Sequence, residues 1–262
     1  MLAPQIDPVA LQLGPLAIHW YGIMYLIGFY LAWRLTRMQL IERGLWQTRI
    51  SPEHYETLFT WLILGVILGG RLGYILFYNL GFYLQHPLEL FAIWQGGMSF
   101  HGGLIGPIVA GWLYCRRHNL PFLALGDAIF TFAPLGLAFG RLGNFINGEL
   151  WGRVSDVPWA MIFPGGGPLP RHPSQLYELA LEGIVLFCLL WFTRNRPMPE
   201  GSRIALFFIG YGIARICCEF FRQPDVQLGF LFAFVTMGML LSSLMVAGGL
   251  GWLLRLRRRA LG

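Results

Sequence analysis

The sequence predicts an all-α integral membrane protein with about seven membrane-spanning helices and a small external cap. Hydrophobic residues make up 56% of the 262 positions and charged residues only 12%, against the roughly 25% charged residues of soluble domains. The mean hydropathy is +0.57. Seven apolar runs approach the roughly 20 helical residues that cross a hydrocarbon core of about 30 Å. We therefore expect one membrane domain over residues 1–262 and exclude a water-soluble fold.

The apolar runs follow one another along the whole chain. They are Leu16–Trp33, Leu58–Tyr78, Phe100–Cys115, Leu120–Phe139, Leu176–Phe192, Ile204–Phe221 and Leu228–Leu254. The third run is short, so Leu88–Met98 before it is either part of this run or a re-entrant segment. Met1–Gly14 contains no arginine and so lacks the basic region of a cleaved signal peptide. The first run is therefore expected to remain as a helix.

The 19 basic residues are all arginines, and most lie at the ends of apolar runs. If the N-terminus lies outside, thirteen of them fall in cytoplasmic loops or at a cytoplasmic C-terminus, as the positive-inside rule expects. They are Arg34, Arg37, Arg43, Arg49, Arg116, Arg117, Arg194, Arg196, Arg203, Arg255, Arg257, Arg258 and Arg259. The loop Asn79–Glu89 has no arginine, which fits an external loop. Spread in this way, the net charge of +6 does not form the basic stripe of a nucleic-acid-binding protein.

Six arginines do not follow this topology and are candidates for function. They are Arg71, Arg141, Arg153, Arg171, Arg215 and Arg222. An arginine in the middle of an apolar run costs about 2.5–3.5 kcal/mol, so we expect acidic partners. Glu219 follows Arg215 by four residues, which places both on one helix face, and Glu149 is a second candidate. Asp127 and Glu182 are given no role beyond packing or ion pairing. The arginines within apolar runs, Arg71, Arg141 and Arg215, either form ion pairs that hold helices together or form an anion clamp. The clamp is possible because the guanidinium group matches the geometry of phosphate oxygens.

A glycine-rich motif surrounds His101. The run is Gly96-Gly97-Met98-Ser99-Phe100-His101-Gly102-Gly103. Open backbone N–H groups at a helix start bind anions, so Gly102 and Gly103 are candidate ligand-binding residues. Such glycines also serve close helix packing. Imidazole titrates near neutral pH, which makes His101 a candidate base for a thiol or hydroxyl group.

The most polar motif, Gly140–Arg153, sets two arginines, two asparagines and a glutamate among four glycines. A helix end needs only one glycine or asparagine as a cap, so the surplus predicts a polar pocket at head-group level. Tyr21, the stretch 171–178 and Tyr211 are candidates to join it. The segment Leu142–Pro173 is rich in glycine and proline and contains Trp151 and Trp159. We expect it to form an external cap on the membrane.

With these motifs the sequence resembles the bacterial prolipoprotein diacylglyceryl transferases. The matching runs are His19–Gly22, Gly69–Arg71, Gly96–Gly103, Gly140–Arg153, Arg171–Glu178 and Tyr211–Pro224, with Gly140–Gly152 as the family signature. The resemblance implies a seven-helix protein of the bacterial inner membrane. It also implies transfer of the diacylglyceryl group of phosphatidylglycerol to the lipobox cysteine of a prolipoprotein signal peptide. Glycerol 1-phosphate would be released in this first step of lipoprotein maturation.

The resemblance further implies a set of critical residues. They are Tyr21, His101, Arg141, Asn144, Glu149, Gly152, Arg215 and Glu219. The hypothesis is that Arg141 and Arg215 hold the lipid phosphate while His101 helps to form the attacking thiolate. Membrane lipid is then a substrate, and no metal or organic cofactor is required. Val154–Pro170 is shorter than in some members, which leaves the size of the cap open.

Two other functions compete with this interpretation. A lipid transporter or scramblase would use the same arginines to bind head groups without breaking a bond. An intramembrane protease would need a serine motif or a pair of membrane aspartates, and the sequence has neither. The four cysteines show no CxxC or CxxH spacing, so neither a disulfide nor a metal site is expected.

Overall fold

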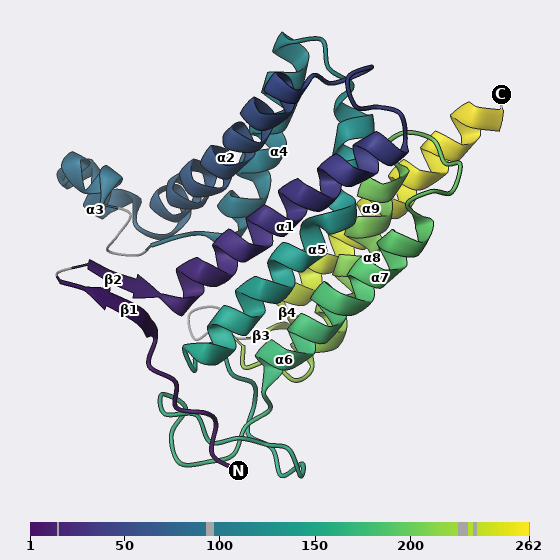
Figure 1. Cartoon of the computed structure of the whole chain (residues 1–262). Coiled ribbons are helices and arrows are strands. Elements are labelled where there is room, and N and C mark those ends of the chain that lie inside the picture. Colours follow the sequence, from purple (N-terminus) through teal and green to yellow (C-terminus); the bar gives the residue numbers. More distant parts are fainter. Residues whose placement is uncertain (15, 93–96, 225–229, 233–234, 262) are drawn as a thin grey trace. The chain divides into compact units, whose positions relative to one another are not determined.

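The computed structural model describes residues 1–14, 16–92, 97–224, 230–232 and 235–261 (Figure 1). Its elements are β1 (Val9–Leu13), β2 (Leu16–His19), α1 (Trp20–Glu42), α2 (Pro52–Tyr78), α3 (Leu80–Gln85), η1 (Pro87–Phe91), α4 (Phe100–Arg117), α5 (Phe122–Ile146), α6 (Ser174–Glu178), η3 (Leu179–Val185), α7 (Leu186–Thr193), α8 (Ser202–Glu219), β3 (Phe230–Phe232), β4 (Val235–Thr236) and α9 (Met237–Leu261). They fall into two compact units: a larger one of Met1–Gln39 with Leu123–Gly262, and a smaller one of Leu40–Phe122.

The structure confirms the predicted all-α class, because each predicted apolar run contains a helix. The last run, Leu228–Leu254, begins differently from expectation, since its described residues before Met237 form β3 and β4 and only then does α9 begin. Among the described residues, four helical segments are long and apolar enough to cross a membrane: α2, α5, the continuous Ser174–Thr193 and Met237–Arg259 of α9. The other runs correspond to α1, α4 and α8, so the number seven stays a prediction. The first run begins differently from expectation, since Leu16–His19 pairs with Val9–Leu13 as an antiparallel hairpin before α1 begins.

In the smaller unit, α2 and α4 pack through their glycines. A Cβ atom on Gly102 would collide with the carbonyl oxygen of Gly69, and one on Gly106 with that of Gly65. Only glycine lets two helix backbones approach this closely. Of the two readings of the glycine-rich motif, close packing therefore accounts for Gly102. A Cβ on Gly103 would meet nothing nearer than the Val66 oxygen at 3.9 Å, so packing does not require glycine there.

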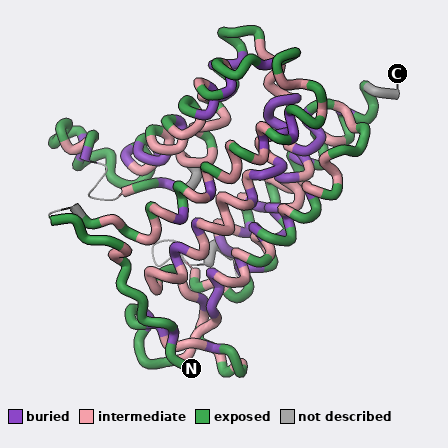
Figure 2. Tube along the Cα trace, in the orientation of Figure 1, coloured by how far each residue is buried: buried purple, intermediate pink, exposed green. Residues whose placement is uncertain are grey.

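In the larger unit, α8 packs along α9 and against the Ser174–Thr193 segment. Leu186, Leu190, Phe207 and Tyr211 form its buried apolar core. Figure 2 shows buried residues recurring along α5 and α8. These helices carry the charged residues described below, so the apolar core fixes their relative positions.

A buried pair of opposite charges joins three helix ends of this unit. Asp127 of α5 accepts hydrogen bonds from the backbone N–H groups of Gly201 (2.9 Å), Arg203 (2.8 Å) and Ile204 (3.0 Å), which caps the start of α8. The Arg203 side chain donates to the carbonyls of Thr193, Arg194 and Arg196, just after α7. Arg203 is fully buried. Arg203 was predicted only to mark the cytoplasmic side of the membrane, and the structure shows that it also joins the end of α7 to the start of α8. Asp127 lies 3.6 Å from the Arg203 guanidinium, so of its two predicted roles, packing or ion pairing, ion pairing is confirmed.

Candidate functional site

Glu178 lies at the centre of a cluster of arginines in the larger unit. Its carboxylate is 2.9 Å from Arg141 of α5, 2.8 Å from Arg215 of α8 and 3.2 Å from Arg222, which follows α8. Glu178 is the last residue of α6, and its three arginine partners lie 37 to 44 residues away in the chain. One carboxylate thereby bridges three of the six arginines that the topology left unexplained.

Two further glutamates complete the cluster. Glu182, one helical turn after Glu178, lies 3.3 Å from Arg141 and 3.5 Å from Arg215. It belongs to η3, a π-helical segment, and such segments are frequent at functional sites. Glu219 lies 2.7 Å from Arg215, as the four-residue spacing predicts. It also lies 3.6 Å from Arg222 and accepts a hydrogen bond from Thr236 at 2.6 Å.

The cluster contains three arginines and three glutamates, and burial separates the two kinds. The side chains of Glu178 and Glu182 are 0% exposed, whereas those of Arg141, Arg215 and Arg222 are 13%, 14% and 12% exposed. The two carboxylates are therefore more deeply buried than the arginines, whose side chains stay partly exposed. The ion-pair alternative is confirmed for Arg141 and Arg215, and the anion clamp stays a prediction.

The Gly140–Arg153 motif forms a second polar group beside Arg141. The Asn144 amide donates to the Glu149 carboxylate at 2.9 Å, and Gln175 donates to the Glu149 carbonyl at 2.6 Å. The Tyr21 hydroxyl lies close to the Asn144 side chain and 3.1 Å from the Tyr25 hydroxyl. Tyr21, Asn144 and Glu149 thus lie near one another, and the polar pocket stays a prediction.

Gly152 lies where two backbone segments meet. Its N–H donates to the carbonyl of His172 at 2.8 Å, and a Cβ atom there would lie 2.8 Å from the His172 Cβ atom and still closer to the carbonyl oxygen of Phe221. A residue with a side chain would push these segments apart. Burial lowers the pKa of the neighbouring His172 imidazole, whose Nδ1 lies 3.0 Å from the Tyr177 hydroxyl.

The remaining unexplained arginines hold backbone segments in place. Arg153 donates to the carbonyls of Arg222 (2.9 Å) and Glu219 (3.1 Å), and Arg171 donates to those of Gly166 (2.8 Å) and Gly152 (3.3 Å). Within the smaller unit, Arg71 donates to the carbonyls of Glu89 (2.6 Å), Leu90 (3.1 Å) and Gly97 (3.3 Å). Each of these three arginines therefore joins backbone segments through hydrogen bonds to their carbonyls.

The predicted anion nest at the start of α4 is occupied by a helix cap. The N–H groups of Gly102 and Gly103 donate to Ser99, through its hydroxyl at 3.3 Å and its carbonyl at 2.9 Å. An anion would have to displace Ser99 to use these donors. His101 belongs to α4, and its side chain lies outside the part that the structure describes. Its role as a base stays a prediction.

A family model described as prolipoprotein diacylglyceryl transferase matches residues 8–255. The chain belongs to this family. Two relatives, both named phosphatidylglycerol–prolipoprotein diacylglyceryl transferase, illustrate the similarity. The one from Bordetella parapertussis is 57% identical over 249 residues, which cover 95% of this chain and 94% of the relative. The one from Pseudomonas aeruginosa is 53% identical over 257 residues, covering 98% and 96%. Family membership and the membrane-length helices together identify an integral membrane protein.

No local pattern indicated that Glu178 and Glu182 share the same arginines. Glu178 belongs to the predicted polar stretch 171–178, and of the two roles predicted for Glu182, packing or ion pairing, ion pairing is confirmed. One signal was available: both glutamates lie in or beside an apolar run at a spacing of four residues, so they face the same side of one helix. Unpaired carboxylates inside a membrane are costly, so the pair itself predicts cationic partners.

Proposed function

We propose that this chain transfers the diacylglyceryl group of phosphatidylglycerol to the lipobox cysteine of a prolipoprotein and releases glycerol 1-phosphate. The site of action is the bacterial inner membrane, with the N-terminus outside and the C-terminus in the cytoplasm. The names of relatives that align over nearly their whole length support this reaction. The observation that carries it is the buried cluster in which shared carboxylates hold Arg141 and Arg215, whose side chains are 13% and 14% exposed.

In this mechanism the guanidinium edges of Arg141 and Arg215 bind the phosphate of the lipid. The cysteine thiolate attacks the glycerol carbon next to the phosphate, a C–S bond forms, and the C–O bond to phosphate breaks. Negative charge then grows on the departing phosphate ester, where fixed cations stabilise the transition state more than the substrate. The thiol proton passes to a base, for which His101 is the candidate.

Glu178 and Glu182 act as positioning residues in the same proposal. Because their carboxylates hold the inner side of Arg141 and Arg215, the N–H groups that point away from them stay aimed at the lipid. Arginine has a flexible stem, and a fixed geometry reduces the entropy lost when the phosphate binds. Glu219 fixes Arg215 in the same way, with Thr236 fixing Glu219 in turn.

The network of Tyr21, Asn144 and Glu149 would bind the glycerol head group or an ester oxygen. All three offer hydrogen-bonding atoms, and Asn144 follows Arg141 by three residues on α5. Gly152 contributes by allowing close backbone contact with His172 and Phe221. Gly102 and Gly103 remain proposed substrate-binding residues only if the ligand displaces the Ser99 cap.

The test is mass spectrometry of a lipobox peptide incubated with the purified protein and phosphatidylglycerol. Wild-type protein should add one diacylglyceryl group to the cysteine, and Arg141→Ala should lose this activity. Arg116→Ala, which removes an arginine at the end of α4, is the matched control and should stay active. If folded wild-type protein binds the lipid but adds no mass to the peptide, the transferase proposal fails and lipid transport becomes the better account.

A further inference from the structure

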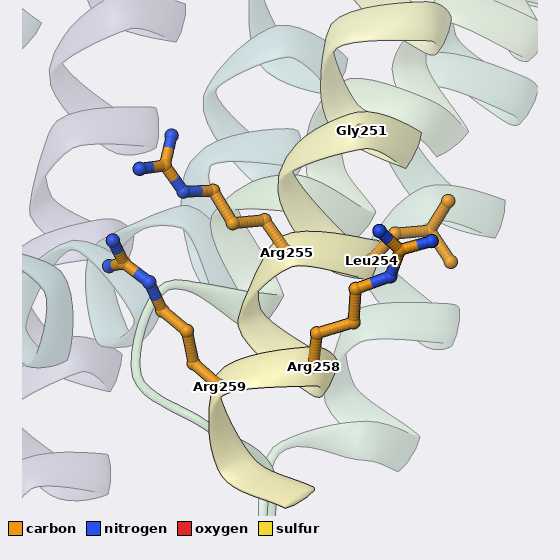
Figure 3. Close-up of a pocket in the computed structure, with 5 residues that line it drawn as sticks. All are labelled: Gly251, Leu254, Arg255, Arg258 and Arg259. Carbon is orange, nitrogen blue, oxygen red and sulfur yellow. The ribbon is translucent and has the colours of Figure 1, made fainter. Parts of the chain in front are cut away.

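A group of arginines near the end of α9 lines an open pocket. The pocket has a volume of about 780 Å³ and is lined by Gly251, Leu254, Arg255, Arg258 and Arg259 (Figure 3). Arg255 and Arg259 extend the same way from successive helical turns, and Arg258 extends toward Leu254. This volume is within the range of sites that hold small molecules, about 300–1,000 Å³.

These arginines differ from those of the Glu178 cluster in their surroundings. Arg141, Arg215 and Arg222 each lie within about 3 Å of a buried carboxylate. Arg255, Arg258 and Arg259 are exposed, and among the described residues no ion pair involves them. Like charges three and four residues apart repel one another on a helix. The site therefore has unbalanced positive charge that an anion would neutralise.

The spacing of the lining residues adds an apolar part to this charge. Gly251, Leu254, Arg255 and Arg258 recur at intervals of three, one and three residues, which places them on one helix face. Leu254 is 56% exposed, and a Cβ atom on Gly251 would meet no atom within 4 Å. Exposed apolar surface thus lies on α9 next to the guanidinium groups. A ligand with a phosphate group and a hydrocarbon chain matches both parts.

We propose that this face of α9 binds one anionic phospholipid of the surrounding membrane. The phosphate contacts Arg258, which extends toward Leu254, and an acyl chain lies over Gly251 and Leu254, while Arg255 and Arg259, which extend the other way, add positive charge. The site is separate from the Glu178 cluster: Thr236, which contacts Glu219, precedes Arg258 by 22 residues, or about 33 Å of helix at 1.5 Å per residue. The proposal does not depend on the transfer reaction.

Native mass spectrometry of the full-length protein, titrated with phosphatidic acid in detergent, tests the site. An arginine near an anionic lipid surface contributes about 1 kcal/mol, which corresponds to about five-fold in affinity. Arg258→Gln should weaken binding of one lipid about five-fold, and the double variant Arg255→Gln with Arg258→Gln about 25-fold. Arg257→Gln is the matched control, because Arg257 carries the same charge on the same turn but does not line the pocket.

Three outcomes would overturn the proposal. If Arg257→Gln and Arg258→Gln weakened lipid binding equally, the arginines would contribute only general positive charge and not a defined binding site. If Arg258→Gln weakened binding of phosphatidylcholine equally, the site would not distinguish an anionic from a zwitterionic phospholipid. Displacement of the lipid by excess inorganic phosphate would show a site for a free anion rather than for a lipid. Because lipid retention is measured, failure here is distinguishable from failure of the transferase activity.

Discussion

Replacing Glu178 by glutamine removes the carboxylate that contacts Arg141, Arg215 and Arg222 at 2.8–3.2 Å. Glutamine has nearly the same shape, so the change acts mainly on charge. It leaves three arginines with two glutamates in a site where Glu178 itself is 0% exposed. Removing one partner from a buried ion pair costs about 3–5 kcal/mol. The expected loss of unfolding free energy is of that size.

A loss of 3–5 kcal/mol predicts a marked fall in thermal stability. At about 2–4 °C per kcal/mol for a chain of this length, the melting temperature in detergent should drop by roughly 6–20 °C. Glu182→Gln should have a smaller effect, because its closest arginine contacts are longer, at 3.3 and 3.5 Å. Glu53→Gln, at an exposed position early in α2, is the charge-matched control and should change the melting temperature little.

The same substitution separates binding from catalysis. Glu178→Gln leaves an excess positive charge, so the KM for phosphatidylglycerol should not rise. The arginines lose their fixed orientation, and a displacement of about 1 Å costs on the order of 100-fold in rate, so kcat should fall by about that factor. Steady-state kinetics with a lipobox peptide gives both constants. A variant with wild-type melting temperature and kcat would refute the positioning role of Glu178.

Three further predictions test other parts of the structure. Gly102→Ala should lower the melting temperature, because its Cβ would collide with the Gly69 carbonyl, whereas Gly103→Ala should leave it unchanged or raise it through the better helix propensity of alanine; equal effects would contradict the packing argument. Asp127→Asn should destabilise the protein by about 3–5 kcal/mol, because Arg203 would stay buried without its counter-charge; unaltered thermal unfolding would contradict this. Gly152→Ala should abolish transfer to the lipobox peptide while the protein remains in the membrane, since the His172 and Phe221 segments must move apart; full activity would show that their close contact is not needed.

Local patterns predicted much of this protein, because hydrophobicity and charge act locally in a membrane. The apolar runs located the helices, although α1 begins at Trp20 since Leu16–His19 forms strand β2. The arginines outside the topology pattern were likewise visible as a set. The pairing of Glu219 with Arg215 followed from helix geometry alone.

Contacts between residues far apart in the sequence could not be predicted from local patterns. Glu178 meets Arg141 and Arg215 only because α5, α6 and α8 pack together, and no local spacing encodes that packing. The same holds for Asp127, which caps a helix 74 residues further along the chain. Composition also did not distinguish an arginine that binds backbone carbonyls, such as Arg71, from one that faces a ligand. His101 stays a prediction because nothing described tests its side chain.

The division of the charged cluster among α5, α6 and α8 has a consequence for biogenesis. Arg141 is synthesised before any of the glutamates that neutralise it in the folded protein, and Arg215 arrives after Glu178 and Glu182. Charged side chains are costly in lipid when alone. We therefore expect α5 to remain near the translocation machinery until the Ser174–Thr193 helix emerges, so that these segments enter the bilayer as a group rather than one by one.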